Sequence, residues 1–397
     1  MVFGLAFPVL LGCAALAVDS ASIYNQRSRM QSVADASSLA VAKELHIYRD
    51  NLAELEEVGK ARVEALLTEV GIAGRPHTTE IGVNPVDNLI DVDIVMVAKA
   101  LLPVGLWSDN PISVSSRARA YGQSRLCILG LHGTKSDTIK ADNGATLTAP
   151  QCAVQSNSTD PNGLHVSGSS QLISTLICSS GGVEGGGSFE PAPQTDCTPL
   201  DNPLASRVPP TAGGCDYLDR KIKNGPVSIS PGVYCGGLKI EKTAVVTAEP
   251  GIYIISGGKL EVKDHGTLTG EYVSFYFDGN SAVFDFAEDT TIDLGAPKDG
   301  PMAGILFFES PTAQKGRDFT IKSENARRLL GTIYLPNGKL KIDSDGDVAE
   351  ESAYTVIVAE QIEVKGANLV VNSDYGGTDV PVPEGLGPNS SMVAIDR

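Results

Sequence analysis

The amino-acid sequence predicts a mainly β protein with a long N-terminal transmembrane α-helix, a small α+β module and a C-terminal parallel β-helix, or β-solenoid. Three observations support this fold class. An uncharged apolar segment opens the chain and continues into residues that favour helix. Residues 125–375 repeat at intervals of about 20–27 residues, and each repeat carries short apolar strands. The chain also has 42 glycines and one tryptophan, a composition that suits many turns and short strands.

Composition excludes some classes of protein before any element is assigned. Apolar residues make up 42% of the chain and charged residues 20%, so a core can form and the chain is not disordered. The net charge is −17 and no lysine- or arginine-rich run occurs, so nucleic acid is excluded as a partner. We expect a well-solvated acidic surface.

The first element, residues 1–47, is predicted to be a membrane-anchoring helix. Residues 1–18 carry no charge before Asp19, and 18 helical residues span about 27 Å, enough for a bilayer core. Two interpretations remain. A small-residue site at 15–17 would suit a cleaved signal peptide, whereas the absence of proline and glycine from 20 to 45 favours one continuous, retained helix.

This segment also resembles a known family. Residues 3–45 share with TadG-like proteins (the TadE/TadG family of the Tad/Flp tight-adherence pilus system) a proline in the apolar run, an acidic residue closing it and a Gln-x-x-Ala-Asp-Ala motif. Those features are Pro8, Asp19, Gln31, Ala34, Asp35 and Ala36. The resemblance implies a single-pass protein of the bacterial inner membrane, with its body in the periplasm or at the cell surface, that acts in pilus assembly or anchoring. The metal-binding Asp-x-Ser-x-Ser motif of many relatives is not matched, so metal-dependent adhesion is not implied.

Residues 48–124 form the predicted α+β module. Apolar residues at 3–4 spacing predict an amphipathic helix at 51–71, which Gly71 ends. Ile90, Val92, Ile94 and Met96 then alternate with polar residues, which predicts a half-buried strand. Residues 113–121 are its expected partner. Asp91 and Asp93 could be imagined as catalytic acids, but their period-two spacing favours solvent-facing positions on the strand. A long helix followed by a small helix-plus-sheet unit is a pilin-like layout.

The β-solenoid prediction for residues 125–375 depends on internal matches. Residues 236–249 match 257–271 with a shift of about 22 residues, so that Leu238, Ile240, Val246, Thr247 and Glu249 correspond to Leu260, Val262, Leu268, Thr269 and Glu271. An earlier pair of repeats aligns Ile139, Ala141 and Leu147 with Leu164, Val166 and Leu172. The segments that begin at Gly251 and Gly331 match as well. Such repetition favours stacked turns over an antiparallel sandwich, which is the alternative for many short strands.

Six cysteines lie within this repeat region, and we expect them to form up to three disulfides in an oxidising compartment. They are Cys127, Cys152, Cys178, Cys197, Cys215 and Cys235. Their spacing suits no zinc site and does not decide the pairing. Residues 181–215 interrupt the repeats and are predicted to be an excursion loop tied down by Cys197 and Cys215. Residues 376–397 are expected to be a mobile C-terminal tail.

No catalytic motif is present, so the sequence predicts no enzyme and no cofactor. Five histidines are scattered singly. Asp285, Asp289 and Asp293 could converge as glycosidase carboxylates, although solenoid turns more often use aspartate as a backbone cap. Asp343, Asp345 and Asp347 faintly resemble a calcium loop, but the position of their glycine favours a tight acidic turn.

The sequence therefore predicts a non-enzymatic, membrane-anchored envelope protein that assembles or anchors a Tad/Flp-type pilus by binding and scaffolding. Its expected partners are pilus-assembly proteins or pilins, the membrane, and the cell wall or a polysaccharide. One alternative is a secreted β-helix adhesin or polysaccharide-binding protein released by cleavage after Ala17. A second alternative is a β-helix polysaccharide-degrading enzyme.

Overall fold

A computed structural model describes residues 2–45, 52–72, 74–84, 88–97, 111–120, 125–386 and 393–395, with side chains from residue 17 onward. The chain forms two compact units. Unit 1 comprises Met1–Gly122 together with Ser391–Arg397, and unit 2 comprises Gln123–Ser390. Unit 2 is therefore an insertion between two parts of unit 1.

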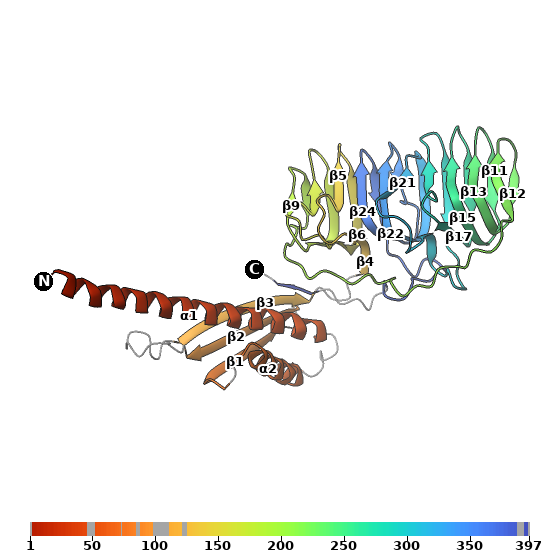
Figure 1. Ribbon diagram of the computed structural model, residues 1–397. Coiled ribbons are helices and arrows are strands. Elements are labelled where there is room, and N and C mark those ends of the chain that lie inside the picture. Colours follow the sequence, from red (N-terminus) through yellow and green to blue (C-terminus); the bar gives the residue numbers. More distant parts are fainter. Residues whose placement is uncertain are drawn as a thin grey trace. The chain divides into compact units, whose positions relative to one another are not determined.

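Unit 1 contains both helices of the described chain, α1 (Val2–Glu44) and α2 (Leu52–Glu69) (Figure 1). The long stretch without glycine or proline gives α1 its continuity, and Gly71 follows α2 with a positive φ of 72°. The predicted membrane span, residues 1–18, lies almost wholly outside the residues whose side chains are described. Over the described part of the chain, no helix is both long and apolar enough to cross a bilayer.

The helices of unit 1 pack on a four-stranded antiparallel sheet with the strand order β1-β2-β3-β26. These strands are β1 (His77–Asn84), β2 (Leu89–Val97), β3 (Pro111–Ala120) and β26 (Val393–Ile395). As the alternation predicted, Ile90, Val92, Ile94 and Met96 are buried in the core shared with α1 and α2. Residues 376–397, expected to be a tail, thus include the edge strand β26, which completes the sheet of unit 1.

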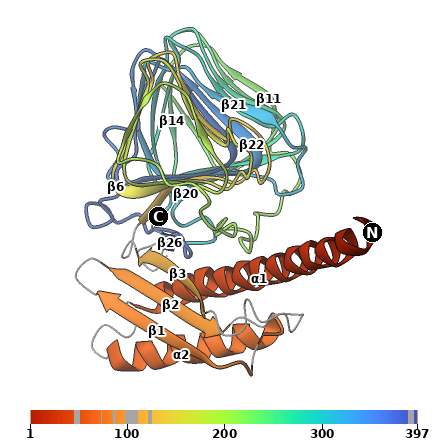
Figure 2. The same cartoon turned by 90° about the vertical axis from the view of Figure 1, so that its left-hand side faces the viewer.

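Unit 2 is a parallel β-solenoid of about 11 turns, built from one 22-stranded sheet that winds around a core. Viewed nearly end-on in Figure 2, the solenoid has three faces. The strands of face A are, in spatial order, β11 (Tyr217–Ile222), β13 (Gly232–Ile240), β15 (Gly251–Val262), β17 (Val273–Asp278), β20 (Ile305–Glu309), β22 (Asn325–Asp343), β24 (Thr355–Lys365), β4 (Arg125–Gly130), β6 (Thr146–Ser156) and β8 (Gln171–Ser179).

Faces B and C use the remaining strands and parts of the long ones. Face B includes β18 (Phe284–Phe286), β21 (Arg317–Ile321), β5 (Ile139–Asp142), β7 (Leu164–Val166) and β9 (Val183–Glu184), together with the later parts of β11, β13, β15, β22 and β24. Face C includes β12 (Val227–Ile229), β14 (Val245–Ala248), β16 (Thr267–Gly270), β19 (Thr291–Gly295), β23 (Asp347–Val348), β25 (Asn368–Val370) and β10 (Ser188–Glu190), with the first parts of β22, β6 and β8.

The turns are not stacked in chain order. The chain enters the solenoid at β4, which lies inside the stack between β24 and β6, and residues 125–190 (block 1) wind outward to the nearer end. Residues 191–216 (the strap) then lead to the opposite end, and residues 217–370 (block 2) wind back until β24 pairs with β4. We call this β24–β4 pairing the seam. In Figure 1 the blue strands β22 and β24 accordingly lie beside the yellow strands of block 1.

Two of the three predicted sequence matches correspond to neighbouring turns, residue for residue, whereas the segments that begin at Gly251 and Gly331 lie in β15 and β22, which are not neighbours in the stack. Leu238 pairs with Leu260, Ile240 with Val262, Val246 with Leu268 and Thr247 with Thr269. In block 1, Ile139 pairs with Leu164, Ala141 with Val166 and Leu147 with Leu172. The repeat prediction is therefore confirmed at the level of register.

The interiors of the two blocks differ in their side chains. Block 2 packs a cluster of buried aromatic rings, in which Phe307 contacts Phe275, Phe277, Phe284 and Phe286 with ring centroids 4.7–6.2 Å apart. Block 1 fills the same interior with aliphatic residues such as Ile128, Ile139 and Leu147. Because each buried aromatic ring removes a large apolar area from water, this cluster contributes strongly to the hydrophobic stabilisation of block 2.

Candidate functional site

The Gln-x-x-Ala-Asp-Ala motif of α1 lies where the helix docks on the sheet of unit 1. Gln31 Nε2 donates to Asp35 Oδ1 one helical turn away (2.9 Å) and to the backbone carbonyl of Ser115 in β3 (2.9 Å). Ser115 lies outside the part of β3 that pairs with β26, which is Ala118–Ala120. Asp35 therefore orients the Gln31 amide, and Gln31 satisfies a carbonyl of the sheet.

Small residues next to this amide let the helix approach β3 closely. Ala34 is fully buried, and the buried hydroxyl of Ser38 lies 2.9 Å from that of Ser116 on β3. Ala36, the last residue of the motif, is exposed on the opposite side of the helix. Most of the motif thus fixes α1 on the sheet, and Ala36 is left for solvent or a partner.

Closer to the N-terminus, α1 is tied to the turn that follows α2. Arg75 donates to the Gln26 side chain, and Arg29 donates to the carbonyl of Val70 (3.3 Å). A surface pocket lies between these elements, lined among others by Val18, Ser22, Gln26, Arg29, Gly71 and Arg75. Asp19 is buried on α1, whereas the side chain of Pro8 lies outside the described residues. These contacts hold the helix just beyond the predicted membrane span.

In unit 2, the six predicted cysteines form three disulfides, Cys127–Cys152, Cys178–Cys197 and Cys215–Cys235. The last two attach the two ends of the strap to opposite ends of the solenoid. The predicted excursion at 181–215 begins later in the structure, because β9 and β10 form a further turn before residue 191. None of the three disulfides crosses the seam, so the two blocks are held together there without a covalent bond.

The strap covers the outward side chains of face A. Gln155 donates to the carbonyl of Thr198 (2.8 Å), and Asn202 donates to Tyr334 Oη (2.9 Å). From β8 to β13 the strap passes nine strands, or eight spacings of about 4.8 Å, a distance of about 38 Å. The 19-residue stretch 197–215 could reach about 60 Å if fully extended, so its length is sufficient.

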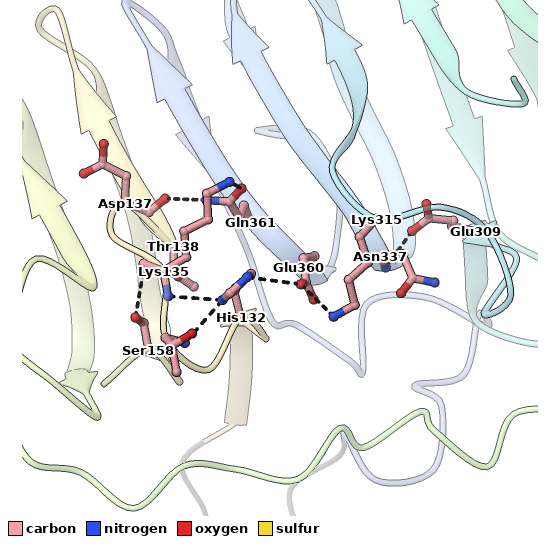
Figure 3. Close-up of polar contacts among 11 residues, drawn as sticks. His132, Lys135, Asp137, Thr138, Ser158, Glu309, Lys315, Asn337, Glu360 and Gln361 are labelled. Atoms are coloured by element: carbon pink, nitrogen blue, oxygen red, sulfur yellow. Dashed lines mark hydrogen bonds and ion pairs between the residues drawn. The ribbon is translucent and has the colours of Figure 1, made fainter. Parts of the chain in front are cut away.

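Polar side chains bridge the seam at the corner between faces A and B (Figure 3). Across the seam, Lys135 Nζ donates to Gln361 Oε1 (2.7 Å). Within block 2, Lys315 Nζ donates to Glu360 Oε1 (3.0 Å). His132 Nδ1 accepts from the Lys135 amide (3.1 Å), which leaves the ring proton on Nε2, 3.6 Å from Glu360. This corner therefore joins the loop after β4 to β24.

A buried ion pair continues the corner into block 2. Glu309 is fully buried and accepts from Arg317 and from the amide of Asn337 (2.8 Å). Burial raises the pKa of Glu309 above its usual range, and the hydrogen bonds from Asn337 and Arg317 partly offset this rise. The sequence did not point to this corner, because its residues come from five separate segments and belong to no motif.

The candidate catalytic aspartates do not converge. Asp285 lies on face B and pairs with Lys259 (2.9 Å), whereas Asp293 lies on face C and pairs with Arg328 (2.5 Å). Asp289 is in the turn between them, 4.0 Å from His265. Each carboxylate therefore has a basic neighbour of its own.

The weak metal candidates occupy a tight turn. Asp347 accepts from Asn368 (2.9 Å), Asp343 lies 4.0 Å from Lys365, and Asp345 is exposed. Ser344 caps this turn by accepting from the Gly346 amide (3.0 Å). Within the described residues, no group of three or more potential ligand side chains is placed to hold a metal ion.

Comparison with protein-family models gives a match that covers α1. Residues 1–44 match the model of the family described as "Putative Flp pilus-assembly TadE/G-like". No curated protein and no solved structure matches the chain significantly. The predicted TadG-like segment is thus confirmed, and a pilus-related N-terminus joined to a disulfide-bonded β-solenoid fits a pilus-associated, extracytoplasmic envelope protein.

Proposed function

We propose that the protein is a membrane-anchored scaffold of a Tad/Flp-type pilus system, which holds or positions pilus components through binding and without catalytic turnover. The observation that carries this proposal is the docked helix. The segment that matches the TadE/G-like model coincides with α1, and two of its side chains, Gln31 of the motif and Ser38 beyond it, fix α1 to a sheet. A helix fixed to a sheet in this way is suited to anchor a folded unit at a membrane.

The solenoid supports a binding role. Its three faces are long and regular, and the strap and disulfides make it suited to an oxidising, exposed compartment. Charged side chains on face B pair between neighbouring turns, as Lys239 does with Glu261 (3.0 Å) and Lys341 with Asp318 (2.8 Å). In this proposal, partner proteins or the cell wall bind to the charged side chains of face B, whose positions are set by these ion pairs.

The test is complementation of a deletion of this gene in its own host, with the full chain and with a variant in which Leu10 and Leu11 are replaced by arginine. We expect the full chain at its intact mass in the inner membrane, resistant to carbonate extraction, with pili restored. The arginine variant should leave the membrane and fail to restore pili. A matched control, Ala61→Arg on exposed α2, adds charge outside the anchor and should behave as the full chain does.

Two outcomes would contradict the proposal. Restoration of pili by the released variant would show that anchoring is not required. A mature protein that lacks residues 1–17 would identify the segment as a signal peptide, and a secreted adhesin or polysaccharide-binding protein would then explain the chain better.

A further inference from the structure

The two ends of the solenoid are open edges of opposite charge. At the block 1 end, β9 pairs with β7 and β10 with β8, and neither pairs with a further turn among the described residues. At the block 2 end, β11 pairs with β13 and β12 with β14, again with no further turn in the described part of the chain. The block 2 end and faces B and C of the block 1 end therefore present backbone groups that could pair with another strand. On face A of the block 1 end, Gln194 of the strap already pairs with Cys178.

The charged side chains of the last turn differ between the ends. The block 1 end carries the exposed Glu184 and Glu190, and its β strands bear no basic residue. On β11 at the block 2 end, the exposed Arg220 and Lys221 outnumber the exposed Asp219, so this strand carries a net charge of +1. Glu184, Glu190, Arg220 and Lys221 form no ion pair within the described residues, although most charges along the solenoid do.

The register of face B shows how these charges would meet. One outward column runs through all the turns, from Lys221 at the block 2 end to Glu184 at the block 1 end. Its members are Lys221, Lys239, Glu261, Asp285, Thr320, Lys341, Glu363, Lys140, His165 and Glu184. A second copy stacked in the same register would place its Lys221 next to Glu184, as Lys239 is placed next to Glu261 (3.0 Å).

Apolar side chains are also exposed at both ends. Leu218 on β11 is 73% exposed, and Phe189 on β10 is half-buried. Covering them with another turn would remove apolar surface from water. A like-with-like contact would instead bring Glu184 and Glu190 against their own copies, which is unfavourable.

We propose that the solenoid binds a second copy of this chain head to tail, with the basic end of one molecule continuing the parallel β-helix on the acidic end of the next. Such a contact joins two different surfaces, so it can repeat along a row of molecules. The proposal does not depend on the pilus role. Charged residues on an edge strand can also prevent edge-to-edge association. The experiment below distinguishes this protective role from the binding of a second copy.

The experiment is sedimentation velocity of the full chain in detergent micelles, over a range of concentrations and at about 50 mM and about 500 mM salt. We expect concentration-dependent association that weakens at high salt. Lys221→Glu and Glu184→Lys should each weaken association by about tenfold or more, because each places like charges together. The double reversal restores opposite charges at the two ends, so it should associate as the unaltered chain does.

The double reversal distinguishes a contact from a folding defect, since two damaging changes would not restore binding. Arg62→Glu on exposed α2 alters the net charge by the same amount and should leave association unchanged. The proposal is overturned if the unaltered chain is monomeric at all concentrations. It is also overturned if association is indifferent to both single reversals, or if the double reversal fails to restore it.

Discussion

Unit 1 and the solenoid bury their cores by different means. In unit 1, two helices cover one antiparallel sheet, and a few specific contacts such as Gln31 to Ser115 set the position of α1. In the solenoid, each turn repeats the contacts of its neighbour, and three disulfides and the strap are added. The described residues of unit 1 contain no disulfide.

This difference distinguishes the contacts of the segment that matches the family from the contacts that any β-solenoid can make. The family match ends with α1, where individual side chains have individual partners. The solenoid needs apolar residues of adequate size at regular positions, and many sequences meet that requirement. We therefore expect single substitutions in the solenoid to act on stability, whereas substitutions in the α1 motif should act on the placement of the helix.

The largest expected effect is at the centre of the aromatic cluster. Phe307→Ala removes a fully buried ring that contacts four others, and we expect it to lower the free energy of unfolding of the solenoid by about 3–5 kcal/mol. When amide hydrogen exchange is measured peptide by peptide, block 2 should lose protection while unit 1 keeps it. Tyr24→Ala, at a side chain that is 77% exposed, is the control. Equal loss in both units would show that they unfold together.

The next effect concerns the strap. Replacement of Cys178 and Cys197 by serine opens a loop with a sequence separation of 19, and we expect a loss of about 3 kcal/mol. Limited proteolysis should then cut within residues 191–216, because only hydrogen bonds, from the backbone around Gln194 and from the side chains of Gln155 and Asn157, still hold the strap on that side. Removal of Cys127–Cys152, which does not touch the strap, is the matched control. If the strap stays protected, face A holds it without the disulfide.

A smaller effect is expected from pH through Glu309. Burial raises the pKa of this carboxyl in the folded state above its unfolded value of about 4.3, so the folded protein binds the proton more tightly. Its contribution to stability is therefore largest below about pH 4.3 and falls as pH rises through the folded pKa. Glu309→Gln lacks this dependence and should become more stable relative to the unaltered chain as pH increases.

Urea midpoints measured across a pH series check this expectation. The change should be smaller than the loss of a disulfide, because the ionised carboxylate keeps its bonds from Arg317 and Asn337. Glu57→Gln, on the exposed side of α2, controls for removal of one charge. If the urea midpoints of the Glu309→Gln variant and the unaltered chain change with pH in the same way, the assigned direction of the pKa shift is contradicted.

Much of the fold could be predicted from the sequence because repetition and periodicity are local signals. The shift that aligns Leu238 with Leu260 is the register of two neighbouring turns. The alternation around Ile90 likewise predicted which side of β2 is buried. Both signals need only residues within a few tens of positions of each other.

The remaining features depend on distant parts of the chain. Every turn has the same apolar pattern, so nothing local indicates that Ile357 pairs with Ile128. The strap determines this order by carrying the chain from one end of the solenoid to the other. The corner around Glu360 follows from that path, as does the return of β26 to unit 1.

The smallest effect tests the docked helix itself. Gln31→Ala removes the hydrogen bond to the carbonyl of Ser115 and should lower the free energy of unfolding of unit 1 by about 1 kcal/mol. Amide hydrogen exchange should become faster in α1 and β3 only. Ser32→Ala, exposed on the next position of the same helix, is the matched control. Because the loss is small, unit 1 should remain folded while the helix is held less tightly. Reduced pilus assembly with normal protein levels would then connect helix docking to function, whereas unchanged exchange in β3 would show that Gln31 does not hold the helix on the sheet.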